Sequence, residues 1–407
     1  VGVCFVAALF TWGFGVFGAS VYLSEIVKAQ SWSTATVSTA ITVFYLTNAL
    51  SLPAIGAIID RHGPRPAISG GIVLLALGVA ALGRLDALWQ LYAAFTCMGL
   101  GYATMSVTGL SAAIAPWFER HQGRSVSLAL TGASLGAMLV VPLLVLAIER
   151  SGFATATLRA AFLMVAILLP LALVVLRFRN PAQLGLARDG GPLAAAPEPG
   201  EDDNADTARE TAKTARRAVL RSAALLSVAL GFALGLMVQI GFLTHHYALA
   251  EPLLGTAGAG WLVGATGLAG LFGRLLLARV IDGINPRRYS MEIMALQALA
   301  LGAVAVAPVV PVLVPVSLVY GFCLGQITTL SPIVVRREFG ADAFGSIYGV
   351  AGTVIQFCSA FGPVFFGVLV TLLGGYAPVL GIAAGLEVLA CTVLWYGFPC
   401  RQGRTNG

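Results

Sequence analysis

Long apolar runs constrain this chain more than any other feature. There are twelve, and each is long enough to cross a hydrocarbon core of ~30 Å as a helix, which takes about 18–25 residues. Only 10% of the 407 residues are charged and 58% are hydrophobic, so a soluble fold could not bury this much apolar surface. The sequence therefore predicts an all-α integral membrane protein with twelve transmembrane helices. The runs are 2–23, 35–59, 67–84, 88–114, 125–148, 155–177, 219–247, 258–280, 289–307, 311–335, 345–371 and 377–398.

A charged phrase occurs twice, at corresponding places in the two halves of the chain. The first copy is Gly56-Ala-Ile-Ile-Asp60-Arg61-His62-Gly63-Pro64-Arg65, and the second is Ala278-Arg279-Val-Ile-Asp282-Gly283-Ile-Asn285-Pro286-Arg287. About half of the chain separates the two copies. A repeat of this period in a membrane protein indicates two homologous bundles with a pathway between them. We therefore expect two pseudo-symmetric six-helix bundles, and transport becomes the leading function.

The stretch between the two halves predicts the domain organisation. Residues 180–218 are rich in Ala, Pro and Gly, then acidic, then basic, without apolar periodicity. We expect an N-terminal bundle over 1–179, a partly disordered cytoplasmic linker over 180–218, a C-terminal bundle over 219–398 and a cytoplasmic tail over 399–407. Val1 adjoins the first apolar run, which we interpret as a membrane span of a trimmed sequence and not as a signal peptide.

The distribution of basic residues predicts the orientation. Nineteen Lys and Arg residues fall in one set of loops and the tail, whereas the opposite loops hold Lys28, Arg84, Arg150 and Arg159. By the positive-inside rule, the repeated loops and both termini face the cytoplasm. The expected location is the cell (inner) membrane, crossed many times. The formal net charge of +6 is then a topology signal and not a sign of nucleic-acid binding.

Several kinds of chemistry find no support in the sequence. The six cysteines lie in or beside the spans without a Cys-x-x-Cys pair, so we expect no metal site and no disulfide. There is no nucleophile–base arrangement and no nucleotide-binding loop. We therefore expect no catalytic residues, no cofactor and no enzymatic activity, and a chain that functions as a monomer in the lipid bilayer.

The charged loops are candidates for gating. An Asp at the end of a helix can bridge to Arg side chains and to a neighbouring helix terminus, and such contacts stabilise one conformation over another. Fixing the topology is the alternative role. In the second copy Gly283 stands in the place of Arg61, which weakens the case for gating by that copy. The gating candidates are Asp60, Arg61, Arg65, Asp282, Arg287 and, in the loop between spans 4 and 5, Arg120.

The repeated loops resemble those of the major facilitator superfamily, and three further phrases narrow the resemblance. Pro116-Trp117-Phe118 with Arg120, Gly123 and Ala129 is similar to the loop before the fifth helix of monocarboxylate transporters and oxalate/formate antiporter-like proteins. Asn180-Pro181-Ala182-Gln183-Leu184-Gly185-Leu186, closed by Asp189-Gly190, resembles the phrase after the sixth helix of their bacterial members. Thr244-His245-His246-Tyr247 and Gly273-Arg274 complete the likeness.

The resemblance implies a carrier of organic anions in which Arg274 holds the substrate carboxylate. The planar guanidinium suits bidentate binding of a carboxylate, and a cation at this depth requires water, an anion or an acid. Snorkelling toward the cytoplasm beside Asp282 is the alternative. This sequence has Gly270 where the animal carriers have an Asp, and its Tyr348–Gln356 region lacks the Lys of the oxalate/formate carrier. With one cation, a dicarboxylate is disfavoured.

Proton coupling requires a group that changes its protonation during the cycle. Glu251 lies at the outer end of span 7, where bacterial relatives carry an acid, and it could pair with Arg274 when no substrate is bound. A solvated loop carboxylate is the alternative. His245 offers an imidazole that titrates near neutral pH, or a structural hydrogen bond. Glu387 lies near the middle of span 12, where a structural hydrogen bond is the alternative to a proton relay.

Aromatic and amide residues of the spans are candidates for lining the cavity. The resemblance implies which helices line the cavity. On these helices, the preferred candidates for substrate-binding residues are Tyr102, Tyr320, Gln326 and Tyr348. Because strong donors other than Arg274 are few, we expect a small, largely apolar anion and not a sugar. The full set is Trp12, Phe14, Tyr22, Tyr45, Asn48, Tyr102, Gln239, Tyr320, Gln326, Tyr348 and Gln356.

The sequence thus predicts a secondary active transporter that works by alternating access. Its expected partners are a small monocarboxylate of the lactate or pyruvate type and protons. Organic-anion exchange without protons is the alternative within transport. A non-transporting membrane sensor of the same fold is the alternative from another class.

Overall fold

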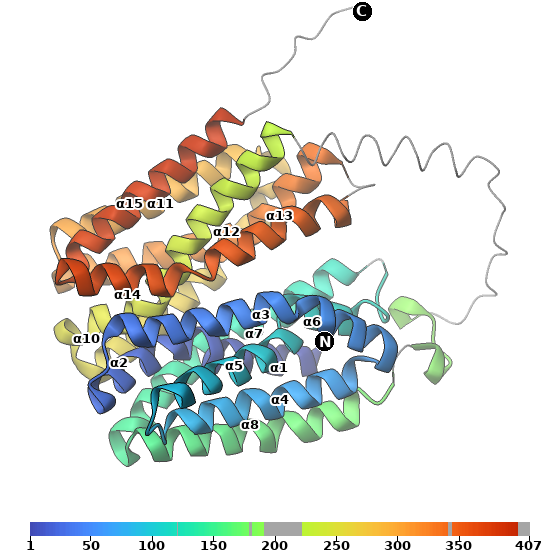
Figure 1. Cartoon of the computed structure of the whole chain (residues 1–407). Helices are drawn as coiled ribbons and strands as arrows, with labels where there is room; N and C mark the ends of the chain where they lie inside the picture. The colour runs from blue at the N-terminus through green and yellow to red at the C-terminus, as the bar shows by residue number, and fades with distance from the viewer. Residues whose placement is uncertain (120, 179–180, 191–221, 341–343, 398–407) are drawn as a thin grey trace, which may run out of the picture.

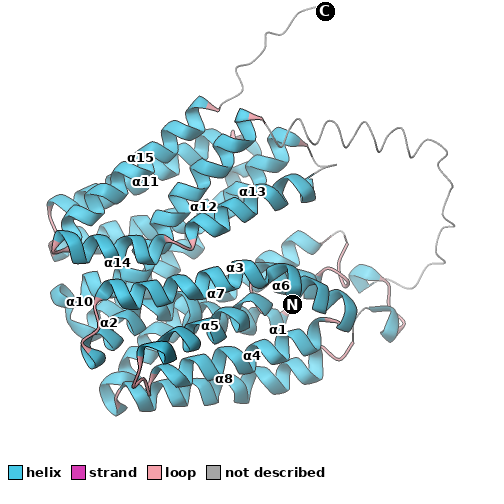
Figure 2. Cartoon of the chain, viewed as in Figure 1, coloured by secondary structure: helices cyan, strands magenta, loops and turns pink. Residues whose placement is uncertain are grey.

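The computed structural model describes residues 1–119, 121–178, 181–190, 222–340 and 344–397. In this part of the chain the regular elements are helices joined by short loops (Figure 2). The first half contains α1 (Gly2–Thr11), the π-helix η1 (Trp12–Phe17), α2 (Gly18–Gln30), α3 (Thr34–His62), α4 (Pro64–Leu82), α5 (Leu88–Thr104), α6 (Val107–Ile114), α7 (Gln122–Ser151) and α8 (Phe153–Val175). Gly2–Gln30 and Leu88–Ile114 each form one membrane span, so this half has six crossings.

The second half repeats this arrangement. It contains α10 (Ala223–Val280), the 3-10 turn η4 (Ile281–Gly283), α11 (Pro286–Val306), α12 (Val310–Phe339), α13 (Phe344–Ser359), α14 (Gly362–Leu373) and α15 (Tyr376–Tyr396). The eleventh span is broken before Gly362-Pro363, because α13 ends at Ser359 and α14 begins at Gly362.

The helix α10 is two membrane spans. Its 58 residues would extend for ~87 Å as one straight helix, almost three times the hydrocarbon thickness. Gly255 divides it with φ 72° and ψ 174°, a left-handed conformation that only glycine adopts without strain. Eleven helical stretches of the described chain are long and apolar enough to cross a membrane. Because α10 crosses twice, the total is the predicted twelve.

The two halves form separate bundles that meet along part of their length. In Figure 1 the blue-to-green bundle of α1–α8 lies below the bundle of α11–α15, and α10 begins in the upper bundle and reaches the left side, where its yellow part lies between the two. The ribbons converge near α2, α10 and α14 and separate toward the other end. We call the end with the two repeated charged loops the motif end. The end with Ser31–Ser33 and Gly255 is the far end.

Small residues bring the helices of the first bundle together. A Cβ on Gly132 would lie 2.1 Å from the carbonyl oxygen of Phe5, and one on Gly136 would lie 2.2 Å from that of Leu9. Both glycines are on α7 and face the first span, next to the π-helix that widens it. Glycine at these two positions therefore permits the close approach of the helices.

Two phrases of the resemblance contact each other. Asp189, in the short 3-10 turn η3 (Arg188–Gly190), donates its backbone N–H to the carbonyl oxygen of Trp117 at 3.0 Å. Its carboxylate accepts the backbone N–H groups of Glu119 (3.2 Å) and His121 (3.4 Å). The start of the predicted linker is thus bound to the loop between α6 and α7. The rest of the predicted linker from residue 191 on and the predicted tail over 399–407 lie outside the described residues.

Candidate functional site

Arg274 lies in the second span of α10 and reaches across to the other half. Its Nη1 donates to the Ser134 hydroxyl of α7 at 3.4 Å, and its Nε donates to the carbonyl oxygen of Gly325 on α12 at 3.3 Å. A guanidinium has five N–H donors, and both of these bonds are long. Among the described residues, no carboxylate forms an ion pair with Arg274. The side chain can therefore still bind an anion.

Glycines fix the backbone around Arg274. A Cβ on Gly273 would lie 2.0 Å from the carbonyl oxygen of Phe322, and one on Gly325 would lie 1.9 Å from that of Gly270. The second span of α10 and α12 are therefore in backbone contact here. A Cβ on Gly270 would lie 3.1 Å from the carbonyl oxygen of Gly321, so this close contact leaves little room for the Asp that the animal carriers have.

Aromatic side chains from the first bundle gather around Tyr102, which interacts electrostatically with Arg274. The ring of Tyr102 lies 5.3 Å from Trp12 and 5.2 Å from Phe44, and Phe44 lies 4.8 Å from Tyr45. We call these four residues the aromatic wall. The residues of the aromatic wall come from the first, second and fourth spans. The structure brings the predicted Tyr102 together with Arg274.

Tyr320, Gln326 and Tyr348 interact within the second bundle. Tyr320 is fully buried, with its ring 4.2 Å from that of Phe242. Gln326 accepts the hydroxyl of Tyr289 at 2.5 Å, and Tyr348 is hydrogen-bonded to Ser331 at 3.3 Å. Tyr320 and Gln326 are completely buried, so substrate contact for these two stays a prediction that requires side-chain movement.

At the far end, Glu251 joins the two halves. It forms an ion pair with Lys28 and accepts the Ser24 hydroxyl at 2.7 Å, both on α2, and it also accepts the Tyr247 hydroxyl at 3.3 Å. The structure therefore places Glu251 with Lys28, and no ion pair with Arg274 is present. A second link crosses the same end, where Thr256 donates to Glu149.

His245 adds a buried contact between the halves. Its Nε2 lies 3.2 Å from both the Ser38 hydroxyl of α3 and the carbonyl oxygen of Pro363, and its Nδ1 lies 3.1 Å from the Tyr376 hydroxyl. Because a carbonyl only accepts, a neutral ring with its proton on Nε2 satisfies Pro363 and lets Nδ1 accept from Tyr376. His245 thus has the geometry of a structural hydrogen-bonding group between the halves.

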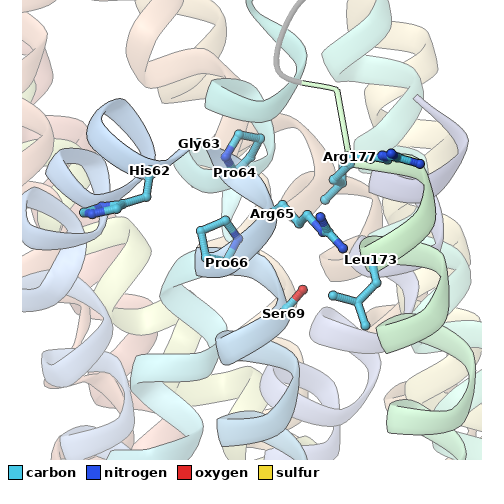
Figure 3. A pocket seen from close by; sticks show the side chains of 9 residues that line it. His62, Gly63, Pro64, Arg65, Pro66, Ser69, Leu173 and Arg177 are labelled. Carbon is cyan, nitrogen blue, oxygen red and sulfur yellow. The ribbon is translucent and has the colours of Figure 1, made fainter.

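At the motif end, the first charged loop faces solvent. Asp60, Arg61 and Arg65 are exposed, and no ion pair of theirs is present within the described part of the chain. In Figure 3 the Arg65 side chain extends over the end of α8, beside Leu173 and near Arg177, inside its own bundle. Arg120 lies outside the described residues.

The second charged loop is tied into its own bundle. Arg337 donates to Asp282 at 3.4 Å and to the carbonyl oxygens of Ile281 and Ile284 at 2.8 and 2.9 Å. Arg287 is fully buried, pairs with Glu338 at 2.7 Å and donates to the carbonyl oxygen of Leu394 at 3.0 Å. These contacts join the loops between spans 8–9 and 10–11 within the second bundle. Whether they gate stays a prediction.

The comparison with protein families decides the fold family. The model described as Major Facilitator Superfamily matches residues 3–363. The chain belongs to the major facilitator superfamily. It is therefore a multi-pass membrane protein, and the resemblance found in its sequence is confirmed at the level of the superfamily.

Three known proteins illustrate the relationship. The oxalate:formate antiporter of Oxalobacter formigenes is 29% identical over 171 residues, which is 41% of this chain and 39% of the antiporter. The fujikurins efflux protein of Gibberella fujikuroi is 33% identical over 112 residues, 27% of this chain and 24% of that protein. A mutant of the nucleoside transporter NupG has a TM-score of 0.74 at 12% identity, covering 97% of this chain and 98% of NupG, and so supports the fold.

Monocarboxylate transporter 13 of Bos taurus is also similar, at 30% identity over 132 residues, 32% of this chain and 31% of that transporter. The chain therefore matches between about a quarter and two fifths of the length of these three sequence relatives. The substrates that their names give are different, and none of them is transferred to this chain by similarity alone.

Proposed function

We propose that the protein is a proton-coupled transporter of a small monocarboxylate, of the lactate or pyruvate type. The observation that carries this proposal is Arg274, an intramembrane cation without a carboxylate partner among the described residues, beside the aromatic wall. A guanidinium binds one carboxylate in a bidentate way, and an aromatic surface favours an apolar remainder of the substrate. The similarity to monocarboxylate transporter 13 supports the same class.

The charge balance supports coupling to one proton. When a monocarboxylate binds Arg274, the pair is neutral, but the site of an unloaded carrier keeps a cation in the membrane interior, which is costly. A carboxyl group that loses its proton when the anion leaves would balance the charge of Arg274. The net charge of the transport site would then be the same in the loaded and the unloaded carrier. Glu251, His245 and Glu387 remain the candidates for this proton.

The contacts between the halves support an alternating-access cycle. Described hydrogen bonds that join the halves occur at the far end and at the level of Ser134 and Arg274. At the motif end, the second charged loop bonds within its own bundle, and the first faces solvent. We interpret this as a conformation closed at the far end. We expect the protein to lie in the inner membrane with its motif end in the cytoplasm. In that orientation, this conformation is the inward-facing state of a carrier that works as a monomer.

Organic-anion exchange without protons is the second candidate. The 41% of the chain that aligns with the oxalate:formate antiporter favours it. A second membrane cation would be expected for a dicarboxylate, because two carboxylates on one guanidinium leave one negative charge unbalanced. The region Tyr348–Gln356 contains none.

Uptake by purified protein in liposomes separates the two candidates. Labelled lactate is supplied outside, with or without an inward proton gradient, and with or without unlabelled organic acid inside. Accumulation driven by the gradient alone supports the proposed function. Uptake that requires an internal anion and ignores the proton gradient supports exchange. No uptake of lactate or pyruvate in either format contradicts the proposed substrate class.

A further inference from the structure

Glu387 is a buried acid without a hydrogen-bond partner. It lies on α15, its side chain is completely buried, and neither carboxyl oxygen has a partner among the described residues. Gly235 of α10 leaves room for it, because a Cβ on Gly235 would lie 3.3 Å from Glu387 Oε2. An unpaired carboxylate in this place would be costly, so burial favours the neutral form of this acid.

The register of the helices places other polar groups on the side of Glu387 that faces the far end. Cys391 of α15 donates to the carbonyl oxygen of Met291 on α11 at 3.3 Å, and α11 and α15 run antiparallel. One turn earlier on α15, Glu387 is therefore level with Met294, whose side chain also lies at Gly235. The next turn toward the far end carries Gln297.

From this level a line of buried polar residues follows α10 toward the far end. Gln297 donates to Gln239 at 3.4 Å, Tyr320 packs on Phe242, and His246 is hydrogen-bonded to Ser317 at 2.9 Å. Gly235 and His246 are eleven residues apart, which is ~16 Å along the helix. We call Glu387, Gln239, Gln297, Tyr320, Ser317 and His246 the polar column.

Each level of the polar column has an unused polar atom. Gln297 Oε1, the Tyr320 hydroxyl and His246 Nδ1 are buried and without a partner among the described residues, like both oxygens of Glu387. Buried polar groups in proteins are normally hydrogen-bonded. A row of such atoms through one bundle offers the polar partners that ordered water requires.

Among the described residues, few other titratable groups surround Glu387. The carboxyl group interacts electrostatically with Tyr320 and Cys323 of α12 and with Cys391 on its own helix. The facing residues of α10 and α11 are Gly235 and Met294, which carry no charge. Arg287 lies near Leu394, about two turns toward the motif end, and is paired with Glu338.

We propose that the polar column is a hydrated proton site, in which Glu387 carries the transported proton and the column connects it to the far end. The polar column ends, on its far-end side, near the contact of Glu251 with Lys28 and Ser24 of the first half. Tyr247, the next residue after His246, donates to this Glu251. Opening of the far end breaks that contact and exposes the column to solvent. A proton then reaches Glu387 through water, and no other group changes its covalent structure.

This inference rests on the proposed proton coupling, and three measurements on the full chain in liposomes test it. The first is exchange of labelled against unlabelled lactate at equal pH, which needs no net movement of protons. The second is uptake driven by a proton gradient. The third is the infrared carbonyl band of neutral carboxylic acids, which reports the protonated Glu387 independently of transport.

For Glu387→Gln we expect exchange to remain, accumulation driven by the gradient to be lost, and one neutral-acid band to disappear. Glu292→Gln is the matched control, because Glu292 is an exposed acid of the same bundle, on α11. It should leave all three readouts unchanged. Gln297→Met keeps the shape of the column but removes an amide, and it should slow driven uptake while the band remains.

Unchanged driven accumulation in Glu387→Gln, with the band still present, would overturn the proton site and leave the proposed function intact. Accumulation driven by a sodium gradient and not by protons would also overturn it, since the same oxygens could bind sodium. A wild-type chain that exchanges lactate but ignores a proton gradient would contradict the proposed coupling itself.

Discussion

Removing the charge of Glu251 should open the far end. Glu251 is 14% exposed and binds Lys28, which is 49% exposed, together with Ser24 across the contact between the halves. A solvent-exposed ion pair contributes about 0.2–1 kcal/mol, whereas a hydrogen bond to a charged group contributes about 1.5–3 kcal/mol. Glu251→Gln keeps an acceptor for Ser24, so we estimate a loss of about 1–2 kcal/mol for the closed state. Since about 1.4 kcal/mol is a factor of ten, the ratio of open to closed carriers should rise roughly five- to thirty-fold.

The distance between spin labels at the far end measures this shift. Asp86 of the first half and Val309 of the second are exposed there and can be labelled in a chain without other reactive cysteines. Glu251→Gln and Lys28→Met should each increase the population with the longer distance, and the double variant should add little to either. Glu25→Gln is the control, because Glu25 binds Lys28 at 3.1 Å but lies on the same helix. Equal distance distributions for Glu251→Gln, Glu25→Gln and the wild type would refute the reasoning.

Three further variants test other contacts. Ser134→Ala removes the acceptor that orients Arg274 and should raise the KM for the substrate several-fold, with an unchanged melting temperature; a changed melting temperature with an unchanged KM would contradict this role. Gly267→Val places a branched side chain where even a Cβ would lie 2.1 Å from Ala137, so it should abolish uptake while Gly302→Val, at an open position, should not. Glu338→Gln removes the charge of the described ion-pair partner of the buried Arg287 and should destabilise the second bundle by about 3–5 kcal/mol, seen as a lower melting temperature in detergent; an unchanged melting temperature would contradict this.

The sequence predicts the twelve spans well because lipid leaves little choice. A backbone in hydrocarbon must satisfy its own hydrogen bonds, so a long apolar run can hardly be anything but a helix. The same reasoning finds Arg274, because a cation at that depth requires a partner or a ligand. Gly255 is less obvious from sequence, since its role depends on a left-handed backbone and not on hydropathy.

The contacts between the halves could not be predicted in the same way. Glu251 is a plausible partner for Arg274 by position in the sequence, yet it pairs with Lys28, because α2 and the end of the first span of α10 meet at the far end. The aromatic wall combines residues of three spans that no local pattern connects. Pairing of this kind depends on the conformation of the carrier, and one sequence encodes more than one conformation.

The role of Arg274 is the central claim, and its most direct test is lactate binding and uptake by the wild-type, Arg274→Gln and Arg279→Gln chains. Arg279 is an exposed arginine on the same helix and controls for the loss of a positive charge. The account predicts that Arg274→Gln loses both lactate binding and proton-driven uptake, whereas Arg279→Gln keeps both. Wild-type binding and uptake in a folded Arg274→Gln chain would contradict it.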